Sequence, residues 1–204
     1  MKKFLLILFV MANFLSISAQ EKIGEYKLSY FPKDTFDIYA DVSNDGDFTY
    51  FIFGESKEPG KKVGFILEKK DINSFITELR SIEDKFEEWS NTAKTNSVTN
   101  YSKNFDTKFK KVGVFFIFGA EWHFNFTKFK PYFKVTDQGI CLAVFNVDEI
   151  TDYSNRFIHH NGFMIAFQNK KEIEDFINVL DPEKLLKKAA EQKADQSAKD
   201  ALFK

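Results

Sequence analysis

The alternation of apolar and polar residues predicts two strand-rich halves, each ending in a helix. In the first half, alternating side chains and short apolar runs indicate strands, because successive side chains of a strand point to opposite faces. Asn44-Asp45-Gly46 is a turn sequence, since asparagine and glycine tolerate positive φ. The predicted strands of this half are 25–31, 36–42, 48–53 and 63–67.

Apolar residues then recur every three or four positions, which is the spacing of one helix face. This stripe runs from Ile72 to Trp89 and predicts a helix over 70–90. Asp71 is the expected N-cap, because its carboxylate can accept a backbone N–H that the first helical turn leaves unpaired. We expect the stripe to pack on a sheet.

The second half repeats this order of elements. Its helix, 170–180, begins with Asn169 and Glu172, whose spacing fits a capping box. Asp181-Pro182 then ends that helix and starts a C-terminal one. The predicted strands of this half are 112–118, 122–126, 132–136, 140–145 and 163–167.

The two predicted helices begin with related sequences, KKDINSFITEL at 69–79 and KKEIEDFINVL at 170–180, which are identical at six of eleven positions. Each follows an apolar run that starts with glycine. We therefore expect an α+β fold of antiparallel strands with helices on one face, built from two pseudo-repeats of strands plus helix and completed by a C-terminal helix.

This order divides the chain into five parts. They are a secretory signal peptide (1–19), a first strand-rich half that ends in an amphipathic helix (20–90), a polar linker (91–104), a second strand-rich half that ends in a helix (105–181) and a charged C-terminal helix (182–204).

The first part has the three-part order of a bacterial export signal. Lys2 and Lys3 precede an apolar run, and small residues follow it up to Ala19. We expect cleavage near Ala19/Gln20 and a secreted or periplasmic protein without a membrane span, because the run is shorter than the ~20 residues that a span needs. A retained membrane anchor is the alternative.

The charge balance argues against a nucleic-acid partner. The chain has 29 basic and 30 acidic residues, so loss of the two signal lysines leaves a net charge of about −3, without the basic field of a nucleic-acid binder. Cys141 is the only cysteine, so no internal disulfide can form.

Trp122, Phe124 and Phe126 alternate with polar residues on one predicted strand, so their rings share one face. Such a face can bind an apolar ligand or stack on a sugar, which makes these three residues the candidate ligand-binding site. Packing in the protein core is the alternative explanation.

Glu121 and His123 share the opposite face of that strand, and His159 and His160 lie in a polar loop with several acidic residues. Histidine and carboxylate side chains are zinc ligands, so these four residues form the candidate metal site. Their spacing matches no metal-binding motif, and solvated histidines explain the pattern equally well. The sequence also lacks nucleophile-elbow and phosphate-loop motifs, so we expect no cofactor.

Together these features predict an exported bacterial envelope protein that binds a protein, peptide or small ligand without catalysis. A small secreted hydrolase, metal-assisted through the histidines, is the alternative. The chain has several strands followed by one helix, and this order occurs twice. In the order of its elements alone, it is similar to whirly-type and purine-rich-element-binding repeats. That resemblance implies a nucleic-acid-binding duplicated fold, a weaker alternative that the expected export disfavours.

Overall fold

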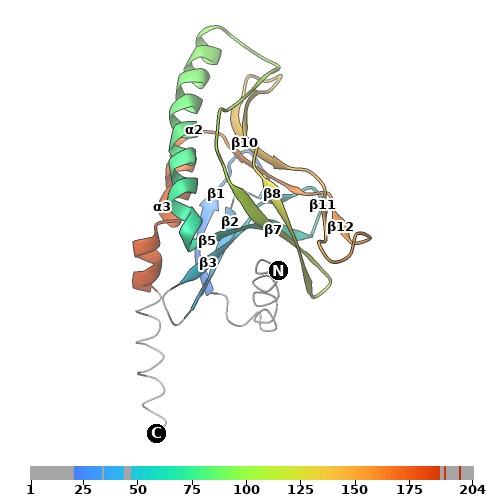
Figure 1. The fold of residues 1–204 in the computed structure, drawn as a ribbon. Coiled ribbons are helices and arrows are strands. Elements are labelled where there is room, and N and C mark those ends of the chain that lie inside the picture. The colour runs from blue at the N-terminus through green and yellow to red at the C-terminus, as the bar shows by residue number, and fades with distance from the viewer. Residues whose placement is uncertain (1–20, 34, 44–46, 189–190, 192–197, 199–204) are drawn as a thin grey trace.

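The computed structural model describes residues 21–33, 35–43, 47–188, 191 and 198. The expected signal peptide and most of the chain after residue 188 lie outside these residues. Within them, strands and helices are mixed and all the strand pairings between long strands are antiparallel, so the α+β class is confirmed (Figure 1). No helix of this described part is long and apolar enough to span a membrane.

The elements follow the chain in an order close to the predicted one. They are β1 (Glu21–Lys27), β2 (Thr35–Val42), β3 (Phe48–Phe53), β4 (Glu55–Ser56), β5 (Lys62–Glu68), α2 (Lys69–Thr95), β6 (Tyr101–Asn104), β7 (Lys111–Phe118), β8 (Glu121–Lys128), β9 (Tyr132–Val135), β10 (Cys141–Val147), β11 (Ile150–Thr151), β12 (His159–His160), β13 (Phe163–Phe167) and α3 (Lys170–Val179).

The strands form a six-stranded sheet in the order β1-β2-β3-β5-β7-β8, a five-stranded sheet in the order β4-β13-β10-β9-β6 and a small pair, β11-β12. Both large sheets combine strands from the two halves of the sequence, since β5 pairs with β7 and β4 pairs with β13. The two halves therefore share their sheets, and the structure does not confirm them as two repeated units.

The helices pack on the inner faces of both sheets. Helix α2 contacts β3 and β5 of the larger sheet and β9 and β10 of the smaller one, while α3 contacts α2, β1 and β13. Figure 1 shows α2 and α3 on one side of the molecule. A single large apolar cluster fills the space between them, with Phe65, Phe75, Phe145 and Phe176 among its buried side chains.

Local features differ from prediction at the start and end of the first helix. Its N-cap is Glu68, which makes no side-chain capping bond, so the prediction that Asp71 caps the helix is wrong. The helix begins earlier because β5 runs directly into it, and Asp71 pairs with Lys110 instead. The segment 91–104, expected as a linker, contains the end of α2 and strand β6.

Both predicted capping residues of α3 bond to the backbone, but Glu172 reaches the N–H of Gln168, one residue before the N-cap Asn169. Asn169 Oδ1 accepts a hydrogen bond from the backbone N–H of Glu172 at 3.0 Å, and Glu172 Oε2 accepts one from the backbone N–H of Gln168 at 2.8 Å. The expected start of the next helix is also present, because the carboxylate of Asp181 accepts the backbone N–H of Glu183 at 2.9 Å and residues 182–188 are helical.

Candidate functional site

Strand β8 forms one edge of the larger sheet, and the candidate ligand-binding residues lie on its outer face. Phe124 is opposite Phe115 in the β7–β8 ladder, and directly opposite residues point to the same side of a sheet. The neighbours of Phe115 in β7, Val114 and Phe116, point inward to the core that contains the helices. Trp122, Phe124 and Phe126 therefore face away from the helices.

An aromatic network extends from β8 across this outer face. The ring of Trp122 lies 4.9 Å from that of Phe115 and 5.7 Å from that of Phe51. The rings of Phe53 and Phe115 are 5.1 Å apart although strand β5 lies between them, because the intervening residue is Gly64 and has no side chain. Phe51 and Phe115 are buried, whereas Phe126 is 51% exposed.

The opposite face of β8 is covered by the loop that follows β10. His123 Nδ1 lies 3.2 Å from Asp152 Oδ2, and the side-chain amide of Asn125 donates to the carbonyl oxygen of Thr151 at 2.5 Å. Glu121, the third residue expected on this face, is exposed. The loop thus covers the polar face of β8 at His123, which is buried, and at Asn125, and it supplies partners for both side chains.

Asp152 is the centre of this contact. Its Oδ1 accepts hydrogen bonds from the backbone N–H groups of Ser154 and Asn155 and from the Ser154 hydroxyl, at 2.6–2.8 Å. Its Oδ2 accepts from the backbone N–H of Phe124 and faces His123. Burial alone would raise the pKa of Asp152, but these hydrogen bonds outweigh it and hold the pKa below its ordinary value.

The His123–Asp152 pair has part of the geometry of a general base. An ionised aspartate at Nδ1 fixes the imidazole tautomer and leaves Nε2 as the reactive nitrogen. His123 is 6% exposed, and its Nε2 has no hydrogen-bond partner within the described part of the chain. The one nearby hydroxyl of the network, Ser154 Oγ, is bonded to Asp152 and not to the imidazole. Asp152 therefore holds the imidazole of His123 in one orientation, and among the described residues no hydroxyl or thiol is bonded to that ring.

His160 is fully buried and contacts the ring of Phe116, and its protonation state follows from its hydrogen bonds. Nδ1 accepts the backbone N–H of Gly162 at 2.9 Å, so the ring proton is on Nε2, 3.2 Å from the hydroxyl of Ser56. Burial lowers the pKa of His160, and the carboxylate of Glu58, 4.0 Å from Nδ1, opposes that shift. His160 is therefore neutral at neutral pH.

The structure gives the metal hypothesis little support. His123 and His160 both contact the ring of Phe116, with centroids 5.0 and 5.5 Å away, whereas Glu121 and His159 are exposed. Over the described ranges, no group of three or more His, Cys, Asp or Glu side chains is placed to hold a metal ion. No chemical step is therefore assigned to a metal.

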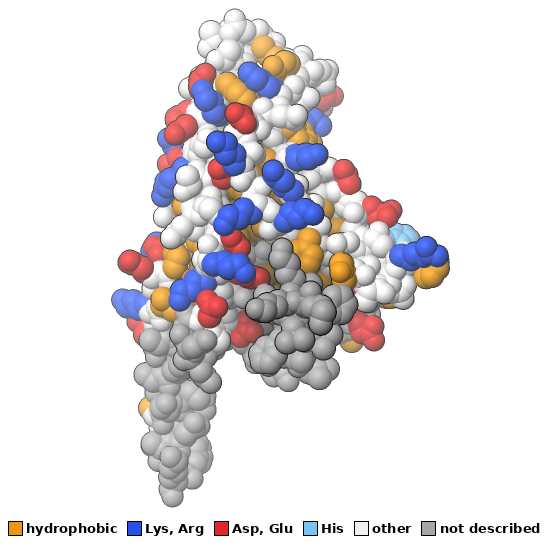
Figure 2. All heavy atoms as spheres, viewed as in Figure 1, with side chains coloured by type: hydrophobic (Ala, Val, Ile, Leu, Met, Phe, Trp, Pro, Cys, Tyr) orange, Lys and Arg blue, Asp and Glu red, His pale blue; other side chains and the backbone are white. Residues whose placement is uncertain are grey.

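The corner beside His123 carries an exposed aromatic surface that the sequence reasoning missed. We name as the β8 corner the tip of the β7–β8 hairpin and the loop 152–158. Phe118, Tyr153 and Phe157 are 54%, 55% and 79% exposed there. Figure 1 shows both segments projecting away from α2, and Figure 2 shows hydrophobic, basic and histidine side chains together on the projection. The sequence feature that could have predicted this surface is the aromatic residue Phe157 next to Arg156 in a polar loop.

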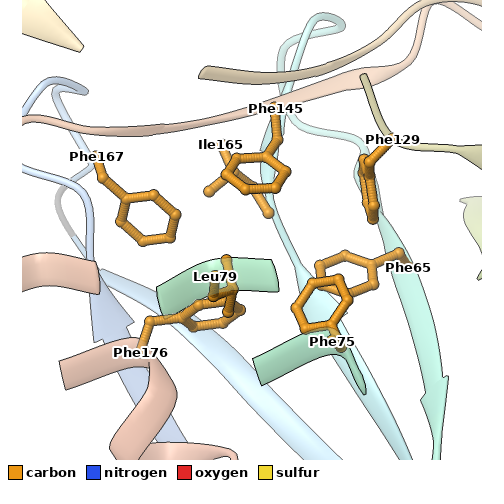
Figure 3. A pocket seen from close by; sticks show the side chains of 8 residues that line it. All are labelled: Phe65, Phe75, Leu79, Phe129, Phe145, Ile165, Phe167 and Phe176. Carbon is orange, nitrogen blue, oxygen red and sulfur yellow. The ribbon is translucent and has the colours of Figure 1, made fainter. Parts of the chain in front are cut away.

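A gap in the core of the described part of the chain is too small to be a binding site. Figure 3 shows apolar side chains from β5, α2, β10, β13 and α3 around a gap that is too small to admit water. Cys141 is buried in β10, as expected for a structural cysteine.

Comparison with known proteins identifies no relative: no family model, no curated protein and no solved structure matches this chain significantly.

Proposed function

We propose that this chain is an exported envelope protein that binds a protein or peptide partner without catalysis, and that the partner docks at the β8 corner. The observation that carries the proposal is the exposure of Phe118, Tyr153 and Phe157 on one projecting corner. Large exposed aromatic side chains can mark interaction surfaces, because their exposure to water is unfavourable until a partner covers them.

The chemistry of the corner favours a macromolecular partner. The guanidinium of Arg156 lies 5.1 Å from the ring centroid of Phe157, and Lys61 Nζ lies 5.1 Å from that of Phe118. Aromatic and arginine side chains dominate the binding energy of protein interfaces. The corner is a projection, whereas small ligands bind in concave pockets.

The loop that presents these residues is held in place before any partner arrives. Its backbone bonds to β8 through the N–H of Tyr153 and the carbonyl oxygen of Phe124 at 2.8 Å. Asp152 fixes the turn that follows, through the N–H groups of Ser154 and Asn155. A preordered loop loses less conformational entropy when it binds, which increases affinity.

A photo-crosslinking experiment tests this proposal. A photoreactive phenylalanine analogue at position 157, in the exported chain, would capture the partner, whose affinity is then measured with purified proteins. We expect Phe157→Ser and Arg156→Gln each to weaken that affinity by about ten-fold or more, as for interface hot spots. Tyr101→Ser, at a 46% exposed ring on β6, is the matched control. Equal affinity of the wild type and the Phe157 variant would overturn the proposal.

Hydrolysis with His123 as general base is a second candidate. It is favoured by one observation: the buried Nε2 has no partner among the described residues while Asp152 holds the ring. Hydrolysis of p-nitrophenyl acetate tests it. If His123 is the general base, His123→Asn should lower the rate of ester hydrolysis by ~100-fold or more. His159→Asn is the control. Equal rates for the wild type and the His123 variant would exclude this candidate.

We also infer that the two halves arose by duplication. The adjacent strands β2-β3-β5 lead into α2, and the adjacent strands β9-β10-β13 lead into α3, so the related helix sequences at 69–79 and 170–180 follow similar strand arrangements. Sequences of homologous chains test this inference, because the similarity should persist in them. Its absence from them would show a chance match.

A further inference from the structure

The sequence Thr-Lys-Phe-Lys occurs twice, at 107–110 immediately before β7 and at 127–130 at the end of β8. The central residues, Phe109 and Phe129, are buried with their ring centroids 6.2 Å apart. Neighbouring side chains of an extended chain point in opposite directions. Anchoring of the two phenylalanines in the core therefore turns the flanking lysines outward, and all four are exposed.

A fifth lysine joins this group through the β7–β8 ladder. Lys111 and Lys128 are directly opposite each other on the two strands. Like charges at directly opposite positions destabilise a sheet, and neither lysine has an acidic partner in the part of the chain that the structure describes. We name Lys108, Lys111, Lys128 and Lys130 the lysine patch; Lys110, which adjoins Lys111, pairs instead with Asp71 of α2.

Acidic side chains near the patch neutralise it only in part. Asp71 pairs with Lys110 at 2.8 Å, and the carboxylate of Glu78 accepts the backbone N–H of Lys108 at 2.8 Å. Residues 101–136 contain seven lysines, no arginine and two acids, Asp106 and Glu121, although the whole chain has a net charge of −1. Figure 2 shows Lys and Arg side chains gathered where α2 borders this region.

An exposed aromatic ring borders the patch. Phe126 is 51% exposed and precedes Lys128 by two residues, so both side chains lie on the outer face of β8. Next to it on β7 is Gly113, whose lack of a side chain leaves the ring open on that side. Lysines with an adjacent exposed aromatic residue are the combination found at the surface of anionic membranes.

We propose that the lysine patch and Phe126 dock the protein on a bilayer that contains anionic phospholipids. Lysine is a flexible point charge suited to diffuse attraction by many headgroups, whereas arginine provides the bidentate fork that reads individual phosphates. The patch contains only lysine, which favours a lipid surface over a nucleic acid. Docking also relieves the repulsion between Lys111 and Lys128, because anionic headgroups lie against both.

Vesicle co-sedimentation of the exported, purified chain tests the proposal. We expect binding to vesicles of phosphatidylglycerol and phosphatidylcholine in about equal amounts, and none to phosphatidylcholine alone. Binding should disappear at about 0.5 M salt, where charges are screened within a few Å. Combined substitution of Lys108, Lys111, Lys128 and Lys130 by glutamine should weaken binding by about three orders of magnitude, or about five-fold per lysine.

The control variant replaces four lysines on the helices, Lys85, Lys94, Lys184 and Lys187, with glutamine, so it has the same net charge and should bind as the wild type does. Thermal unfolding of both variants confirms that they are folded. Phe126→Ser should weaken binding to vesicles while leaving its salt dependence unchanged. Equal binding by the two four-lysine variants would overturn the proposal. Binding of single-stranded DNA to the patch would also overturn it, if anionic vesicles fail to displace that DNA.

Discussion

The Nδ1 atom of His123 and the Oδ2 atom of Asp152, 3.2 Å apart, join the edge strand β8 to the loop beyond β11. The same carboxylate accepts the N–H of Phe124, and the carbonyl oxygen of Phe124 accepts the N–H of Tyr153. Backbone groups on a free sheet edge can pair with other chains and cause aggregation. This pair of residues therefore covers the edge of β8 at Phe124 as well as shaping the β8 corner.

Asp152→Asn should destabilise the protein. An amide can replace only some of the hydrogen bonds that the carboxylate accepts, and its own N–H groups would face the donors Ser154 and Asn155. We expect a loss of ~2 kcal/mol in the free energy of unfolding, as for buried groups left without partners. Urea denaturation measures it, with Asp148→Asn, whose side chain is 88% exposed, as the control.

The same variant gives a test at acidic pH. The pKa of Asp152 is lower in the folded protein than in the unfolded chain, where it is ~4. Its contribution to stability is therefore fully present above about pH 4 and is lost as the pH falls through the folded-state pKa. The difference between wild type and Asp152→Asn should be constant near neutral pH and shrink in acid. A difference independent of pH would contradict this account of Asp152.

His160 predicts a second dependence on pH. Its pKa is lowered by burial, so the unfolded chain takes up a proton at a higher pH than the folded protein does. The stability that depends on neutral His160 is present above about pH 6.5 and is lost as the pH falls through the folded-state pKa. Protonation would also place a hydrogen on Nδ1, against the N–H of Gly162.

His160→Asn removes this titration. We expect the wild-type protein to lose stability relative to the variant as the pH falls below about 6.5, measured by denaturant unfolding at fixed temperature. His159→Asn, at an exposed neighbour, should follow the wild type. Parallel curves for wild type and His160→Asn would show that this histidine is not responsible for the loss.

Gly162 and Gly139 provide a matched pair for backbone strain. Both have positive φ, +85° and +77°, which disfavours residues with a side chain. A Cβ at Gly139 would meet no atom within 4 Å, whereas a Cβ at Gly162 would lie 1.9 Å from the carbonyl oxygen of Asp148.

We expect Gly139→Ala to cost ~1 kcal/mol and Gly162→Ala ~3 kcal/mol or more in the free energy of unfolding. Chemical denaturation of the two variants measures these costs. Equal costs would mean that the backbone around residue 162 can move away from a side chain.

Local sequence determined much of the secondary structure. Strands β3 and β13 have the predicted bounds, and Asn169 caps α3 as predicted, because side-chain periodicity and capping involve residues only a few positions apart. The N-terminus of α2 was predicted wrongly at Asp71, since the direct connection from β5 decided where that helix begins.

Tertiary structure alone decided which strands pair and which face of β8 is buried. The sequence left open whether the stripe with Trp122 and Phe124 binds a ligand or packs in the core, whereas in the structure the loop covers the opposite face and supplies Asp152 to His123 from 29 residues away. Sequence periodicity shows that a strand has two different faces. Only long-range contacts determine which face is covered, and so which aromatic residues of the β8 corner and which lysines remain exposed.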